Sequence, residues 1–351
     1  MLENIPGFPV FTASFLYPNC RNINMRIHIP NSAWIGNIDP FIGSFDVRNE
    51  KELIITSHRK WIAVHPAVIC MLVSLGRFIK DNGGEVKIMP MTTKTKPYFE
   101  RIGFFKFLDP DSGMKIKEHE SSGRFIPLTY INDSIKLDEC ITEMIPLLHA
   151  DPKKVEPIRY VISELVRNVM EHARAKEGAL VCAQYYQKTN TIRIGVSDTG
   201  VGIRRSLNQA HPEVKTHMEA IRKAMMPGIS GTTRQDWGTD FNAGVGLFFI
   251  KAIAQVNRNF FMIYSGNALY KLLKVDKNKK VALHADPFED KHSKGKDYPF
   301  WHGTVVGVDI TLEETSDFVE LLDTIREFYR KHEIKRPKSL KFKRPVFING
   351  D

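Results

Sequence analysis

The sequence predicts an α/β protein with about two domains. Strand-like runs and amphipathic helical runs alternate from residue 24 to residue 110, an order that places helices against a sheet. A second series of strands and helices follows from residue 124 to residue 313. With 351 residues the chain is long enough for each series to bury its own core. We expect four parts: an N-terminal extension at 1–23, α/β domains at 24–123 and 124–313, and a C-terminal helix and basic tail at 314–351.

The first domain shows the clearest local signals. Alternating apolar residues predict strands, and apolar residues three and four positions apart predict helices. Gly83 and Gly84 mark the end of the longer helix, since glycine favours the turn that follows a helix. The expected strands are 25–29, 52–56 and 85–89, and the expected helices are 67–81 and 96–102.

The run HPAVICMLVSLGRFIKDNGGEVKI at 65–88 is followed by YFERIGFFKFL at 98–108. This succession of loop, helix, Gly-Gly turn, strand and closing helix resembles the STAS domain of anti-anti-sigma factors. That family carries a phosphorylated serine at the start of the helix, where this chain has His65, Pro66 and Ala67. The resemblance therefore implies a fixed docking or dimerising surface and no phosphorylation switch at that position.

The second domain contains one predicted hairpin. Two alternating runs flank Thr189 and Asn190, residue types that suit a tight turn. The expected strands are 125–131, 179–184, 191–196, 260–265 with a hairpin partner, and 305–310, and the expected helices are 138–148, 151–173, 248–256 and 315–332.

A polar row lies on the helix expected at 151–173. Glu164, Asn168 and His172 recur at intervals of four, so a helix places them on one face, and the opposite face is apolar. Such a row is either a solvated face or one wall of a site, and the motifs downstream favour a site.

The first of these motifs is Asp-x-Gly-x-Gly at the end of a strand. Asp198 can accept a hydrogen bond from an exocyclic amine there. Gly200 and Gly202 let the backbone approach a flat base closely. Taken alone, the same pattern is also typical of an ordinary turn.

Two further motifs follow. Gly244 and Gly246 form a Gly-x-Gly turn before Leu247, where a helix begins. The free N–H groups and the positive dipole end of a helix attract phosphates. The segment Trp301-His302-Gly303-Thr304 then leads into a strand, and the Thr304 hydroxyl suits the base side of a site or a bridging water.

In this order and spacing, the four motifs resemble those of the GHKL (Bergerat-fold) ATPases over about residues 124–313, and within them the anti-sigma-factor serine kinases and histidine kinases. The resemblance implies an α/β sandwich with a mixed, mostly antiparallel sheet and helices on one face. It also implies ATP and Mg²⁺ as ligands. The implied roles are Glu164 as general base, Asn168 as Mg²⁺ ligand, His172 near the phosphates or ribose, Asp198 with Gly200 and Gly202 around adenine, Gly244, Gly246 and Leu247 around the phosphates, and Thr304 on the base side.

Two connecting segments have expected roles. The resemblance makes the basic, glycine-containing segment at about 203–241 the lid over ATP. The segment 274–297, rich in Lys, Asp and His, replaces a tight connection between strands, and we expect an exposed hairpin or a disordered loop there. Its two histidines lack metal-ligand spacing.

Composition limits the alternatives. The four cysteines have no redox or metal-ligand spacing, which indicates buried free thiols in a reducing compartment. The N-terminus lacks a signal-peptide pattern, and the most apolar stretch, 61–79, contains His65, Pro66 and Arg77, so we expect a cytoplasmic protein with no membrane span. The net charge is +10, with many cations in the tail, where they form either a solvated terminus or an attraction for nucleic acid.

The sequence therefore leads to one main hypothesis about function. It is a signalling-type regulatory protein that binds Mg-ATP and controls a protein partner or a homodimer through its lid and STAS-like domain. ATP hydrolysis or phosphoryl transfer to a protein hydroxyl accompanies binding in this hypothesis. The alternatives are a nucleic-acid-associated GHKL ATPase that uses the basic tail, and a scaffold in which ATP is structural.

Overall fold

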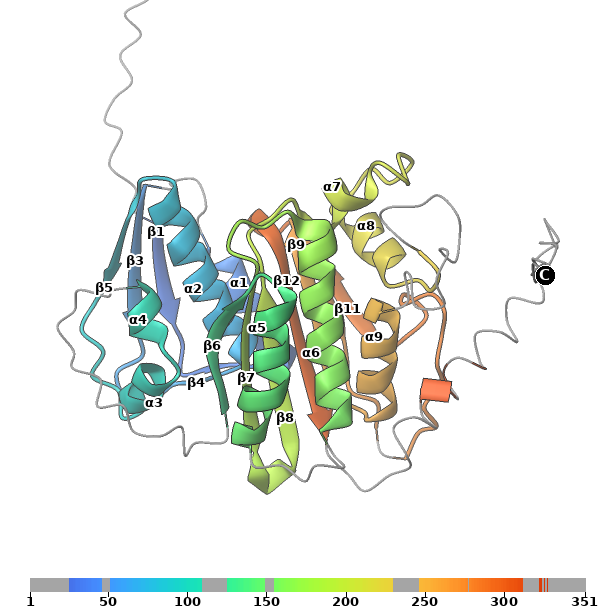
Figure 1. The fold of residues 1–351 in the computed structure, drawn as a ribbon, viewed down its shortest axis with the longest axis horizontal. Coiled ribbons are helices and arrows are strands. Elements are labelled where there is room, and N and C mark those ends of the chain that lie inside the picture. Colours follow the sequence, from blue (N-terminus) through green and yellow to red (C-terminus); the bar gives the residue numbers. More distant parts are fainter. Residues whose placement is uncertain are drawn as a thin grey trace, which may run out of the picture.

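The structure is a computed structural model, and it describes residues 25–45, 51–108, 125–148, 155–229, 246–276, 278–311, and positions 322, 323, 325 and 327. The described residues form a three-stranded sheet near the N-terminus, a larger seven-stranded sheet and a small two-stranded sheet (Figure 1). The mixed α/β class that the sequence predicts is confirmed.

The large sheet is antiparallel between every pair of neighbours. Its order is β11-β10-β9-β12-β8-β7-β6. The expected hairpin is confirmed, with Asn190 in the left-handed region at φ 46° in its turn. The strands are β6 (Phe125–Ile131), β7 (Ala179–Tyr186), β8 (Thr191–Ser197), β9 (Phe261–Gly266), β10 (Ala268–Leu272), β11 (His292–Gly295) and β12 (Trp301–Thr311).

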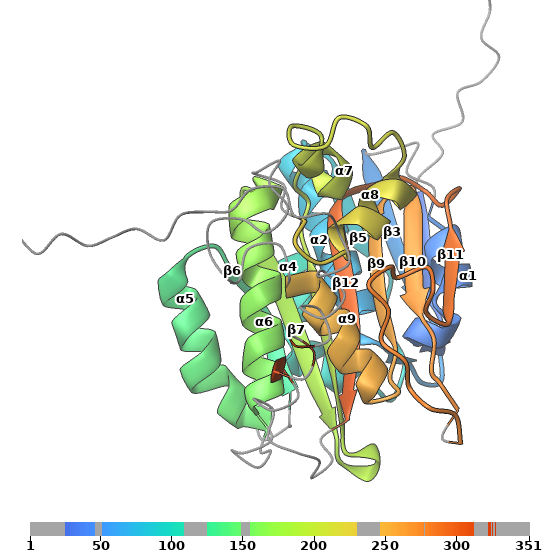
Figure 2. The ribbon, with the colours of Figure 1, turned by 90° about the vertical axis from the view of Figure 1, so that its right-hand side faces the viewer.

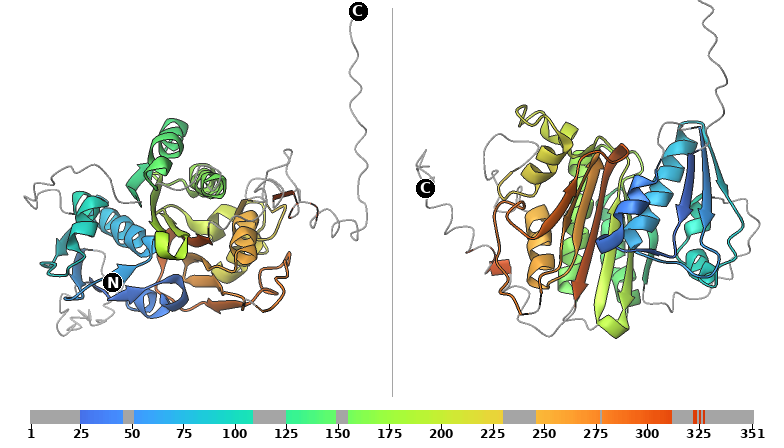
Figure 3. Two further views of the ribbon diagram at one scale, coloured as in Figure 1. Left: turned by 90° about the horizontal axis from the view of Figure 1, so that it is seen from below. Right: turned by 180° about the vertical axis from the view of Figure 1, so that it is seen from behind.

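One face of this sheet packs against helices that lie between its strands in sequence. Alternate residues of the central strands, such as Ile194 and Ile263, join one apolar core with α6 (Glu156–Asn168) and α9 (Gly246–Val256). The helix α5 (Ser134–Glu139) stands outside α6 (Figures 2 and 3). Two short helices, α7 (Gly202–Leu207) and α8 (His217–Ala224), follow β8.

The N-terminal module has the predicted order of strands and helices. A parallel sheet of order β1-β3-β5 packs against the buried helix α2, whose N-terminal cap is His65. Its elements are β1 (Met25–Ile29), β2 (Ser32–Ala33), α1 (Asp39–Gly43), β3 (Glu52–Ser57), β4 (Ala63–Val64), α2 (Pro66–Asp81), β5 (Glu85–Ile88), α3 (Lys96–Arg101) and α4 (Phe104–Leu108).

The helix α2 also covers the second face of the large sheet. The facing glycines Gly195 of β8 and Gly307 of β12 leave a flat patch there, and the start of α2 lies on it. A Cβ atom on Gly195 would lie only 2.3 Å from the backbone nitrogen of Ala67. At the same place the buried His65 Nε2 lies 3.1 Å from Asp309 Oδ1 of β12. Both faces of the large sheet are therefore buried.

The N-terminal module shares its apolar core with the large sheet. Its core continues into the outer face of the large sheet through residues such as Leu180, Met262 and Tyr264. Arg193 of β8 lies between two aromatic rings, 4.0 Å from the centre of Trp34 and 4.3 Å from that of Tyr186. The start of α2, where the STAS resemblance places a phosphorylated serine, is buried against the chain's own sheet. The division into domains at residue 123 stays a prediction.

Two expectations about elements need correction, and a third is described only in part. The helix expected at 138–148 begins at Ser134, because Asp133 caps it by accepting a hydrogen bond from the Lys136 backbone N–H at 2.8 Å. It continues as a π turn at Cys140–Met144 and a 3₁₀ turn at Ile145–Leu148. The segment 274–297 is not simply exposed, since β11 pairs with β10 and Asp290 is 5% exposed. The C-terminal helix is described only at 322, 323, 325 and 327, which are helical, and the basic tail lies outside the described residues.

Other expectations concern cysteines and membranes. Cys70, Cys140 and Cys182 are buried free thiols, as predicted, and Cys20 lies outside the described residues. Within the described part of the chain, no helix is both long enough and apolar enough for a membrane span.

Candidate functional site

The polar row predicted on the helix is partly retained. Glu164 and Asn168 belong to the α-helix α6, but the chain then widens into a π turn, η5 (Val169–Ala173). His172 lies in the π turn, so its position relative to Glu164 and Asn168 does not follow α-helical spacing. The turn ends at Arg174, which is left-handed at φ 52°.

Asp198 lies at the end of β8, where the sequence predicts the adenine carboxylate. Its side chain is buried, with 3% of the residue exposed. Its Oδ1 accepts a hydrogen bond from the Gly200 backbone N–H at 2.8 Å. Its own backbone N–H donates to the Thr304 carbonyl at 2.9 Å, and the indole of Trp301 donates to its carbonyl at 3.2 Å. The carboxylate is thus held in place, and its two oxygens have lone pairs enough to accept from a ligand as well.

Glycines allow the loop after Asp198 to approach its neighbours. A Cβ on Gly200 would lie 2.0 Å from the carbonyl oxygen of Ala173, and Val201 donates its N–H to that same oxygen at 2.8 Å. The end of the helix motif and the Asp-x-Gly-x-Gly loop are therefore in direct contact. On the other side, Gly303 has φ 96°, and a Cβ there would lie 2.5 Å from Asp198 Oδ1.

The start of α9 meets the same helix. A Cβ on Gly246 would lie 2.4 Å from Glu164 Oε2. Glu164 is therefore located at the N-terminal end of α9, where free N–H groups attract anions. Leu247 packs partly buried against the core of the large sheet. Gly244 lies outside the described residues, so the structure does not test its role.

Two residues that sequence reasoning missed connect the parts of the site. Ser265 Oγ donates to the Gly303 carbonyl at 2.8 Å and accepts from the Ile203 N–H at 3.1 Å. It also lies 3.4 Å from the hydroxyl of Thr304. Trp301 is the second, through its bond to the Asp198 backbone. Ser265 ends a strand that looked purely structural, and only the pairing of β9 with β12 brings it to the site.

Burial shifts the pKa values of the three titratable site residues. It raises the pKa of Asp198 from 3.8 to about 7, although backbone hydrogen bonds act in the opposite direction. Burial also raises the pKa of Glu164, against the attraction of Arg167. For His172, burial lowers the pKa despite the nearby Glu171. The imidazole is therefore neutral at pH 7 and can offer a hydrogen bond to phosphate or ribose, but no positive charge.

A magnesium site made of many protein ligands is absent from the described residues, where no three His, Cys, Asp or Glu side chains cluster. Magnesium bound to phosphates needs only one or two protein oxygens. Asn168 fits that need, since it lies one turn from Glu164. Its Nδ2 atom is buried without a hydrogen-bond partner in the described part of the chain, so the amide is not committed to a structural contact there.

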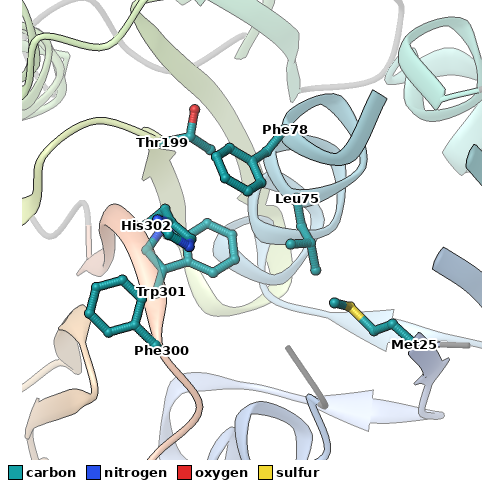
Figure 4. Close-up of a pocket in the computed structure, with 7 residues that line it drawn as sticks. All are labelled: Met25, Leu75, Phe78, Thr199, Phe300, Trp301 and His302. Carbon is teal, nitrogen blue, oxygen red and sulfur yellow. The ribbon is translucent and has the colours of Figure 1, made fainter. Parts of the chain in front are cut away.

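A small hollow lies between α2 and the Asp-x-Gly-x-Gly loop (Figure 4). The rings of Phe78 and His302 stack there with centroids 4.7 Å apart, and Thr199 stands beside them. The lining residues Leu75 and Phe78 come from α2, so this hollow belongs to the contact with the N-terminal module and is separate from the helix α6 side. One turn back, Ser74 and Ser197 share a hydrogen bond of 2.7 Å.

Comparison with protein families supports the assignment of the second domain. Residues 139–258 match the family model of the histidine kinase-like ATPase domain. A search of curated proteins finds no match. The matched range covers α6, the Asp-x-Gly-x-Gly loop and the start of α9, and the site residues from Ser265 to Thr304 lie beyond it. It supports ATP binding of the GHKL type, for which Mg²⁺ is the usual accompanying ion. It does not extend to residues 25–108, where the STAS-like resemblance stays a prediction.

Proposed function

We propose that this protein is a regulatory, kinase-like ATP-binding protein whose site binds Mg-ATP between α6, the Asp198 loop and the start of α9. Asp198 Oδ2 accepts from the adenine amine, and Gly200 and Gly202 shape the pocket around the base. Asn168 supplies the protein oxygen to Mg²⁺, and Gly246 lies at the phosphate end.

The contact of three separate motifs carries this proposal. Gly200 touches Ala173 at the end of the helix motif, and Gly246 touches Glu164 near its middle. Both glycine corners therefore border the polar edge of one helix, as a nucleotide enclosed between them requires. Asp198 is buried at one of these corners, and its carboxylate, an acceptor with several lone pairs, gives the site a specific acceptor for an amine.

The same site offers a general base for a reaction at the γ-phosphate. Glu164 is 17% exposed on its side chain, and burial raises its pKa toward the range in which a carboxylate accepts a proton effectively. We propose that it orients a water or a protein hydroxyl, so that either hydrolysis or phosphoryl transfer follows. When bound, Mg²⁺ would neutralise charge on the phosphates.

The N-terminal module has a direct route to this site. Ser74 of α2 bonds to Ser197, the residue before Asp198, and Phe78 stacks on His302 beside Gly303. We propose that the module and the lid together link ATP occupancy to the binding of a protein partner or a second copy. The buried start of α2 cannot be the binding surface for that partner.

Calorimetric titration with ATP tests the binding site. Wild type, Asn168→Ala and Asp198→Asn are titrated with and without Mg²⁺. We expect binding by the wild type that magnesium strengthens, loss of the magnesium effect in Asn168→Ala, and binding about 10- to 100-fold weaker in Asp198→Asn, the loss expected when a buried acceptor becomes a donor. Equal and magnesium-independent affinity in all three proteins would exclude the site.

Turnover separates an enzyme from a structural ATP site. Glu164→Gln should abolish release or transfer of the γ-phosphate and leave ATP binding intact. Glu156→Gln, in the first turn of the same helix, is the matched control and should behave like wild type. If wild type binds ATP but mass analysis of protein and nucleotide finds no product, ATP is structural.

A further inference from the structure

The segment 274–297 makes two anchored contacts with the ATPase-like domain. It follows β10, contributes the edge strand β11, and returns to β12. Between the two strands it passes beside α9 (Figure 2). We call its described residues, 274–276 and 278–297, the insert.

The first contact is a buried polar cluster between the insert and α9. Asp290 and Lys251 form an ion pair in which both side chains are fully buried. Lys251 also donates to the His284 carbonyl at 3.0 Å. One turn further along α9, Gln255 donates to Asp290 Oδ1 at 2.7 Å, and His284 Nδ1 lies 2.8 Å from that oxygen. A buried ion pair with these extra hydrogen bonds fixes the relative position of its two elements.

The second contact joins the insert to α8. The guanidinium of Arg222 forms two hydrogen bonds with the carboxylate of Asp286, one of them 2.9 Å long from Nε to Oδ1. The same guanidinium lies 4.9 Å from the ring centre of Phe288, and the Lys294 ammonium lies 3.8 Å from that ring centre. A bidentate contact with a carboxylate restrains both the position and the orientation of an arginine side chain.

The Phe288 ring itself is fixed by the sheet. It stacks nearly parallel on His292 of β11, with centroids 5.2 Å apart, and lies at 6.2 Å from the ring of Tyr270 in β10. The hydroxyl of Tyr270 donates to the Pro287 carbonyl at 2.7 Å. The insert is therefore a rigid support that rests on the sheet edge and is bonded to α8 and α9 at once.

We propose that the insert is a positioning element for the phosphate end of the nucleotide site: Asp290 sets the position of α9, and the Asp286–Arg222 pair holds the insert itself in place. The inference rests on the proposed function. Gly246, the first residue of α9, touches Glu164, so a shift of α9 alters the end of the site that holds phosphate. Asp198 lies at the adenine end of the site, and the contacts that hold it in place do not involve the insert.

A charge reversal at the exposed pair tests this without disturbing the core. The full chain is titrated with Mg-ATP and, separately, with AMP, which shares the adenine end but lacks the outer phosphates. Asp286→Arg should weaken Mg-ATP binding about tenfold, a typical coupling between contacting groups, and leave AMP binding unchanged. The double variant Asp286→Arg with Arg222→Asp exchanges the two charges, so the ion pair can form again and Mg-ATP affinity should be restored. The matched control is Glu100→Arg, which reverses a charge in the Lys96–Glu100 pair of α3 and should have no effect.

The outcomes separate the two proposals. A wild type that binds neither nucleotide overturns the proposed function. Wild-type binding that persists unchanged in Asp286→Arg overturns the role of the insert alone. Equal weakening of Mg-ATP and AMP, or no recovery in the reversed pair, also overturns it, because general destabilisation would then explain the loss.

Discussion

Asp198→Asn should make the unliganded protein more stable at alkaline pH while it weakens ATP binding. The substitution keeps the shape of the side chain and leaves an oxygen to accept from the Gly200 N–H. It removes a carboxyl group that burial holds at a pKa of about 7. The folded protein therefore retains an ionised carboxylate above pH 7 at a cost, and binding of an adenine amine is what makes that carboxylate useful.

The magnitude follows from the pKa. In the unfolded chain the carboxyl of Asp198 has a pKa near 3.8, and in the folded chain it is about 7. At about 1.4 kcal/mol per pKa unit, ionisation costs the folded state about 4 kcal/mol. Because the folded pKa is the higher one, the folded chain keeps a proton that the unfolded chain releases. The free energy of unfolding therefore falls as the pH rises to about 7, and about 3 kcal/mol of that fall lies between pH 5 and pH 8.

Urea denaturation without nucleotide at pH 5, 6, 7 and 8 measures this effect. Every other titrating group is shared by the two proteins, so the difference between their free energies of unfolding isolates Asp198. That difference should change by about 3 kcal/mol in favour of the variant from pH 5 to pH 8. Parallel pH profiles for the two proteins would refute the reasoning, since they would mean that Asp198 is well solvated and unsuited to a buried site.

Three further predictions concern packing and burial. Gly195→Ala should lower the free energy of unfolding by about 3 kcal/mol in urea titrations, because a Cβ atom there collides with the start of α2. The control is Gly43→Ala, whose Cβ would have no atom within 4 Å and which should leave the free energy of unfolding unchanged. Lys251→Met should cost about 3–5 kcal/mol in the same measurement, because Asp290 is left buried without its cation. Burial lowers the pKa of His65, so at acid pH the unfolded chain binds a proton that the folded chain does not, and the free energy of unfolding falls below pH 6.5. His65→Gln should reduce this fall, which urea denaturation at pH 5 and pH 7 measures.

For each of these three predictions, one result would contradict the reasoning. Equal stability of Gly195→Ala and Gly43→Ala would mean that α2 does not rest on the glycine patch. A Lys251→Met protein as stable as wild type would mean that the ion pair is solvated. An unchanged acid profile in His65→Gln would place the imidazole in water.

The sequence by itself determined most local elements and singled out residues that the structure then brings together. The period-two run 179–184 becomes a strand because its alternate residues face two different cores, and the alternate apolar residues of 191–196 face one of them. Asp198 and its glycines are recognisable in sequence because a carboxylate at a strand end and a backbone without Cβ atoms are local requirements. The same holds for Glu164 and Asn168, which one turn of α-helix aligns.

Only the tertiary structure decided which distant residues meet. Nothing local distinguishes Gly195 from any other glycine in a strand, yet it provides the surface for α2 from a separate part of the chain. Ser265 reaches the site through strand pairing, and Asp290 becomes buried because Lys251 lies opposite it across 39 residues of sequence. The π turn that contains His172 forms where Ala173 meets the Asp198 loop. Contacts between distant segments depend on how whole elements pack, and residue spacing along one element carries no information about them.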